Sequence, residues 1–116
     1  MANAEEGQVG FQADGKEWTL EITNRTERSI QVKLKCSMGE VMKRLGDGDV
    51  TILQAVFHEA LKKHHPTITE FEAIDLVSPR QIRKLVGDIL ATTYPTAEEK
   101  QNPPQPDQAG ETGSAS

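Results

Sequence analysis

The sequence predicts an α+β fold that is mainly helical, in which an N-terminal β-hairpin packs on about four short helices and a disordered C-terminal tail follows. An alternating segment with a central Asp-Gly pair predicts the hairpin, and repeated helix-start signals predict the helices. The C-terminal residues contain no large apolar side chain and are rich in Pro, Gln and acids, which predicts the tail. We therefore expect one globular domain at 8–95, with the hairpin at 8–23, the helical part at 24–95 and the tail at 96–116.

The segment VGFQADGKEWTLEI predicts the hairpin in detail. Asp14-Gly15 is a favoured two-residue turn, and the residues on both sides of it alternate between apolar and polar. This turn sets a register that places four apolar side chains on one face, with Phe11 opposite Trp18 and Val9 opposite Leu20. Because two strands alone are marginally stable in water, this face must pack on helices.

Residues 24–36 fit either a third strand or a helix. Alternate positions from Ile30 to Cys36 are apolar, which suits a strand, but Ile30 and Leu34 also have the spacing of a helix. The periodicity of this segment therefore leaves both alternatives open.

Three residue pairs have the spacing of a capping box, in which each side chain binds a free N–H at a helix start: Ser37 with Glu40, Thr67 with Glu70, and Ser78 with Gln81. Pro79 strengthens the last start signal, since a first helical residue needs no N–H. Before the second pair, Asp49 or Thr51 can cap a helix whose apolar stripe runs to Leu61. Pro95 should end the last helix.

The composition argues against nucleic acid and membranes as partners and favours other proteins. The net charge of −5 argues against broad attraction to nucleic acid or to anionic membranes. Cys36 is the single cysteine, which excludes an intrachain disulfide, and the start MANAEEGQ lacks the features of a signal peptide. No apolar run approaches the roughly 20 residues that span a bilayer. We expect a cytoplasmic protein that binds other proteins, with no membrane partner.

The sequence predicts no enzyme, no cofactor and no metal site. Neighbouring residues on a helix diverge by about 100°, so His64 and His65 cannot readily chelate one ion. A zinc-protease pattern starting at His58 would require a histidine at Lys62. Cys36 has no base nearby in sequence, and the GDGD segment has carboxylates where a phosphate loop needs bare N–H groups. We expect the two histidines to end a helix, where cations complement its dipole.

A small helix-turn-helix DNA-binding regulator is an alternative. The segment TITEFEAIDLVSPRQIRKLV is similar to that motif, and the would-be recognition helix from Pro79 opens with Arg80, Gln81, Arg83 and Lys84. Such motifs usually have a small residue five positions before the valine of the turn and a glycine directly before it. Glu72 and Leu76 occupy those positions here, which argues against tight packing of the two helices.

Residues 9–95 resemble tail assembly chaperones of gene transfer agents and related long-tailed phages, some of which are named tail tube proteins. The resemblance is carried by the hairpin, by SMGEVMKRL before the GDGD turn, by ALKKHHPTIT and by LVGDILATTYP. The block with HHP is its most specific part, and none of these motifs is catalytic. Similar sequences usually have an apolar helix ending in glycine where this chain has TERSIQVKLKC, with Lys35 at the glycine position.

The resemblance implies a role in tail morphogenesis of a phage, prophage or gene transfer agent. Such a chaperone coats the tape measure protein until tail tube proteins displace it, so both are expected partners, and self-association is compatible with the role. We expect the contact on helices between Val41 and Leu61. Val41 and Met42 are the residues expected to be exposed, because their short helix has the least room to bury them. A tail tube or connector subunit is a further alternative, although one short hairpin offers few strand edges for a ring.

Overall fold

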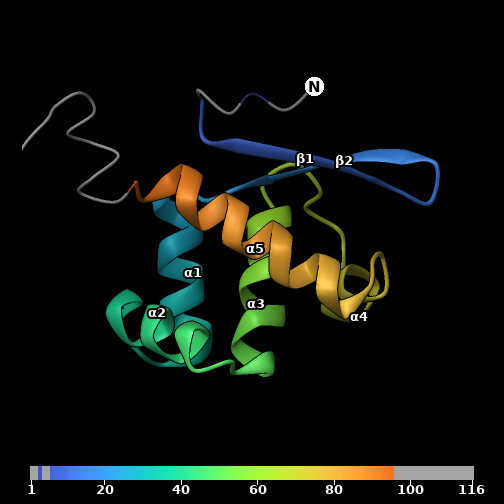
Figure 1. Cartoon of the computed structure of the whole chain (residues 1–116). Helices are drawn as coiled ribbons and strands as arrows, with labels where there is room; N and C mark the ends of the chain where they lie inside the picture. The colour runs from blue at the N-terminus through green and yellow to red at the C-terminus, as the bar shows by residue number, and fades with distance from the viewer. Residues whose placement is uncertain (1–2, 4–5, 96–116) are drawn as a thin grey trace, which may run out of the picture.

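The structure, a computed structural model, describes residue 3 and residues 6–95. A hairpin of β1 and β2 comes first and five helices follow in the described chain: β1 Gln8–Ala13, β2 Lys16–Glu21, α1 Asn24–Leu34, α2 Met38–Gly46, α3 Val50–Leu61, α4 Glu70–Ile74 and α5 Pro79–Thr93. Figure 1 shows the hairpin lying across one end of the helices, with α3 between α1 and α4. The predicted α+β, mainly helical class is confirmed. The tail predicted at 96–116 lies outside the described residues.

The hairpin has the predicted turn and register. Asp14 and Gly15 have φ of 54° and 71°, the positive values that a two-residue turn of this kind needs at both positions. Phe11 pairs with Trp18 and Val9 pairs with Leu20. The apolar face packs on the helices as expected, since β2 contacts α3 and β1 contacts α5.

Residues 24–34 form a helix, which settles the alternative that periodicity left open. Thr23 caps the start of α1 by accepting a hydrogen bond from the Thr26 N–H, and Ile30 is fully buried. Lys35 ends the helix in the left-handed conformation, with φ of 59°. This conformation favours glycine, and Lys35 adopts it here, so the helix ends at this position without a glycine.

Local caps start the other helices, and one start differs from its prediction. Ser37 and Ser78 accept the N–H groups of Glu40 and Gln81, which is the first of the two hydrogen bonds of each predicted capping box. The capping box predicted for Thr67 with Glu70 is wrong, because α4 starts two residues later with Thr69 and Glu72 as its box. The His58 Nε2–H donates to the Ile68 carbonyl at 2.9 Å, which holds the chain after Pro66 in an irregular loop until Thr69.

Helix α3 forms the centre of the core. It contacts the hairpin strand β2 and the other four helices, and every residue from Ala55 to Leu61 is buried. The described residues contain no helix with the length and apolarity needed to cross a membrane.

The hydroxyl of Tyr94, directly after α5, donates to the Glu27 carboxylate on α1. Burial raises the pKa of Tyr94 and this hydrogen bond raises it further, so the phenol keeps its proton and fastens α5 to α1.

Candidate functional site

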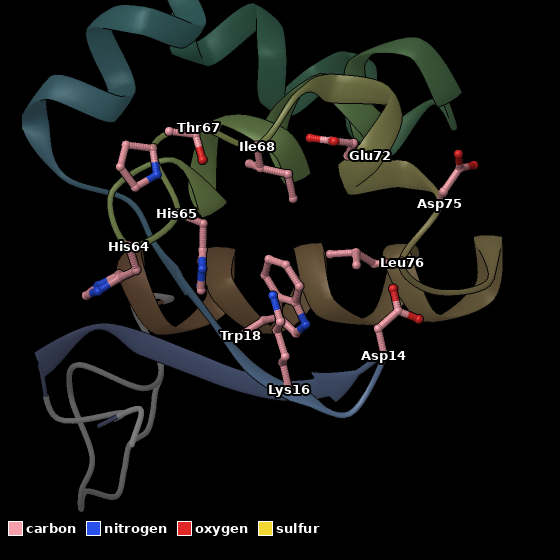
Figure 2. Close-up of a pocket in the computed structure, with 11 residues that line it drawn as sticks. Asp14, Lys16, Trp18, His64, His65, Thr67, Ile68, Glu72, Asp75 and Leu76 are labelled. Carbon is pink, nitrogen blue, oxygen red and sulfur yellow. The ribbon is translucent and has the colours of Figure 1, made fainter.

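A cleft of about 680 Å³ lies between the tip of the hairpin and the loop that joins α3 to α4. We call it the hairpin cleft, and Figure 2 shows its side chains. Segments that are far apart in the sequence build it: the hairpin, the HHP loop, and the region from α4 to Leu76. Its lining residues are Asp14, Lys16, Trp18, His64, His65, Pro66, Thr67, Ile68, Glu72, Asp75 and Leu76.

His65 joins the loop to the hairpin. The Thr19 N–H donates to His65 Nε2 at 3.1 Å. Thr19 does not exchange ladder hydrogen bonds with its partner Gly10, so its N–H points away from β1 and is available to the imidazole. The rings of His65 and Trp18 have centroids 4.6 Å apart. The imidazole is therefore neutral with its proton on Nδ1, and it occupies the outer edge of β2.

His64 points to a different part of the hairpin. Its Nε2–H donates to Glu21 Oε1 at 2.8 Å, so the two histidines bind β2 at separate positions. The expectation that they end a helix is wrong in detail, because α3 ends at Leu61 and both lie in the loop that follows. Their N–H groups still donate to the Leu61 carbonyl. Within the described residues, no group of three or more His, Cys, Asp or Glu is arranged to hold a metal ion.

Trp18 supplies the aromatic wall of the cleft. Its Nε1–H donates to the Ala13 carbonyl at 2.9 Å, which fixes the ring, and the Lys16 ammonium lies 5.7 Å from the ring centroid. Ile68 and Leu76 add apolar surface. The arrangement suits an amphipathic segment of another protein, which would stack on the ring and on the aliphatic side chains.

The charges of the cleft are mainly negative. Asp14, Glu72 and Asp75 line it, against Lys16. Glu72 Oε1 already accepts the Thr69 N–H at 2.9 Å as part of its capping box. The carboxylates of Asp14 and Asp75 have no ion pair within the described residues. They can therefore bind cationic side chains on the polar face of a bound segment.

The hydrogen bond to His65 predicts a pH dependence of stability. Burial lowers the pKa of His65 below its ordinary value of 6.5, and the charges of His64 and Lys16 lower it further. The unfolded chain then binds the proton more readily than the folded chain does. The stabilisation is complete above pH 6.5 and is lost as pH falls through the lower folded pKa. We expect the melting temperature of the wild type to decrease as the pH is lowered from 6.5.

Two variants assign this effect to His65. In His65→Gln, the side-chain oxygen can still accept the Thr19 N–H, but the amide does not titrate. The melting temperature of this variant should therefore change less with pH than that of the wild type. His64→Gln removes one of the charges that lower the pKa of His65, so its melting temperature should still fall in acid, but by less than that of the wild type. Equal acid sensitivity in the wild type and both variants, measured by circular dichroism, would show that another group causes the loss.

The residues expected to bind DNA under the alternative reading lie together on the surface of α5. Arg80, Gln81, Arg83 and Lys84 are all exposed, and Lys84 pairs with Asp88 at 2.8 Å. The preceding helix α4 has five residues and begins with two acids, Glu70 and Glu72. In a helix-turn-helix protein the first helix crosses the DNA backbone, where these carboxylates would repel phosphates.

The two residues expected to contact a partner differ in their exposure to solvent. Val41 is 0% exposed, so its predicted exposure is wrong, whereas Met42 is 40% exposed. A helix of two to three turns still turns one face to the core, and Val41 lies on that face against α1 and α3. Phe71, which the sequence did not mark as a contact residue, is 78% exposed and lies between the two acids at the start of α4. Its isolation from any apolar stripe was the available signal.

The site thus combines the hairpin with the HHP block, two segments that are separated by more than 40 residues in the sequence. Trp18 packs against the core, as the hairpin register predicts, and the ring of His65 contacts it beside the cleft. No protein-family model, curated protein or solved structure matches this chain.

Proposed function

We propose that this protein is a tail assembly chaperone of a phage, prophage or gene transfer agent, which binds the tape measure protein and keeps it soluble before the tail tube polymerises. One observation supports this proposal most directly. The hairpin and ALKKHHPTIT, two of the segments that carry the resemblance to such chaperones, form the walls of one cleft. A shared recognition surface gives a physical reason for both motifs to occur together.

The hairpin cleft suits weak binding of an amphipathic helix. Trp18 and Leu76 offer apolar contact, and the carboxylates at the rim attract cations on the polar side of such a helix. Exposed Met42 and Phe71 offer further apolar contact outside the cleft. A chaperone that coats a long helical partner needs many weak contacts along it, because tube subunits must later displace each copy.

Two structural features disfavour the alternatives. The acidic α4 would lie near DNA phosphates in a helix-turn-helix complex, which opposes the regulator even though Arg80 and Arg83 are exposed. A tube subunit that forms rings through strand edges needs open edges, and His65 already binds the Thr19 N–H on the outer edge of β2. Neither feature argues against protein binding through the cleft.

Co-expression with fragments of a tape measure protein tests the proposal. The fragments should stay soluble with the wild type and precipitate without it. Thr67→Arg with Asp75→Arg places two long cations on the cleft rim, so this variant should fail to keep the fragments soluble. Both residues are exposed, so the fold should be retained, as checked by circular dichroism.

A matched control keeps the residue types and the change in net charge. Thr51→Arg with Asp47→Arg alters two exposed residues outside the cleft and should solubilise the fragments like the wild type. Loss of function in both variants would refute the role of the cleft. A wild type that leaves the fragments insoluble and binds duplex DNA in a salt-sensitive manner would favour the regulator.

A further inference from the structure

A second surface lies where α1 packs against the end of α3, away from the hairpin cleft. Two adjoining hollows of about 650 and 540 Å³ share Arg25, Ser29, Glu59 and Lys62. We call this combined surface the α1 groove. Its α1 wall includes the stripe at positions 25, 28, 29, 32 and 33, a spacing that places side chains on one face of a helix. It shares only Pro66 with the residues that line the hairpin cleft.

The α1 groove is positive in a chain whose net charge is −5. Its charged side chains are five cations and one carboxylate: Arg25, Arg28, Lys33, Lys62, Lys63 and Glu59. The Glu59 side chain is only 5% exposed, and its oxygens lie 3.4 Å from Lys62 Nζ and 3.9 Å from Lys33 Nζ. The one acid of the groove is therefore already neutralised by its neighbours.

Three of the cations have no such partner. Within the described residues, Arg25, Arg28 and Lys63 form no ion pair. Arg25 also lies in the first turn of α1, where the positive end of the helix dipole disfavours a cation. The fold gains nothing from a cation there, whereas an anion in the groove would be attracted by the guanidinium groups and by the dipole together.

We propose that the α1 groove binds an acidic segment of a partner protein, with Arg25 and Arg28 contacting its carboxylates. An acidic peptide suits the surroundings better than nucleic acid does. Glu27 lines the adjoining hollow and Glu70 lies 2.5 Å from Lys33, so acids flank the groove and would repel a continuous phosphate backbone. Val32, which is 68% exposed in the groove, offers an apolar contact that a peptide side chain can use.

The proposal does not rest on the role in tail assembly. It concerns a different surface and a different chemistry, since the hairpin cleft is mainly negative and the α1 groove is positive. A failure to solubilise the tape measure protein would therefore not contradict the proposal for the α1 groove. A protein that has both surfaces can bind two segments of opposite charge at once.

Fluorescence anisotropy with the full chain tests the α1 groove. The probes are a labelled peptide of alternating glutamate and alanine and the same peptide with glutamine for glutamate. The glutamate peptide should bind and the glutamine peptide should not. Arg25→Glu with Arg28→Glu should weaken binding at least about tenfold, because two ion pairs become repulsions. Acids near the start of α1 suit its dipole, so a loss of binding would not arise from loss of the helix.

A control with the same change in net charge separates the groove from general electrostatics. Arg80→Glu with Arg83→Glu lies on exposed α5 and should bind the peptide within about twofold of the wild type, since screening limits distant charges. Equal weakening in both variants, or no binding by the wild type, would overturn the proposal. Tighter binding of single-stranded DNA than of the glutamate peptide, lost in the Arg25 and Arg28 variant, would overturn it in favour of a phosphate site.

The acidic residues of the chain itself supply the last test. Tyr94 contacts Glu27 on α1, and two acids, Glu98 and Glu99, follow it closely in the sequence. Glu98→Gln with Glu99→Gln in the full chain should bind the glutamate peptide with unchanged affinity if the groove serves a separate partner. A tenfold gain in affinity would overturn the choice of an external partner, because it would show that this segment competes for the groove.

Discussion

Val41→Asp is expected to unfold the domain at room temperature. Val41 is 0% exposed and is the buried residue of α2, so the new carboxyl group would lie in the core with no cation and no hydrogen-bond donor provided for it. Burying such a group costs several kcal/mol, and a domain of this size has roughly 5–15 kcal/mol of total stability. Circular dichroism at 222 nm should show loss of most helical signal, or a melting transition far below that of the wild type.

Met42→Asp is the matched control, one residue along the same helix. Met42 is 40% exposed, so its new carboxylate can reach water, and the free energy of unfolding should change by only about 0.5 kcal/mol. Similar melting temperatures for the two variants would contradict the burial of Val41. Of these two variants, only Met42→Asp can report on partner binding. A binding defect of a Val41 variant would reflect unfolding, whereas Met42→Asp removes an exposed side chain from a folded domain.

Phe57→Ala is expected to lower the free energy of unfolding by about 3–5 kcal/mol. The ring is 0% exposed at the centre of α3, and its centroid lies 5.8 Å from that of Phe11 on β1. Removing it leaves a cavity between the hairpin and the helices that neighbouring side chains fill only in part. The urea midpoint should fall while the slope of the transition stays unchanged.

Phe71→Ala removes the same side chain from the surface. Phe71 is 78% exposed, so its loss should change the free energy of unfolding by less than about 0.5 kcal/mol. A large loss in this variant, or a small one in Phe57→Ala, would show that the core is centred elsewhere. If Phe71 contacts a partner, its substitution should reduce co-purification with tape measure fragments at unchanged stability.

Features that depend on residues close in sequence were determined by the sequence. Asp14-Gly15 predicts the turn, and the turn sets the register of the whole hairpin, because strand pairing propagates residue by residue from it. Ser37 and Ser78 start α2 and α5 through hydrogen bonds to an N–H three residues later. The backbone satisfies these interactions within one turn, so distant parts of the chain have little influence on them.

Packing between distant elements decided the rest. Residues 24–34 are compatible with a strand and with a helix, and the helix prevails because it buries Ile30 against α3. His65 and His64 bind residues 46 and 43 positions away, which no rule of local spacing relates to them. Both candidate surfaces arise in the same way, since a cleft or groove forms where two elements meet. The sequence specifies the faces of each element, and only the tertiary structure decides which faces are buried together and which side chains remain at their margins.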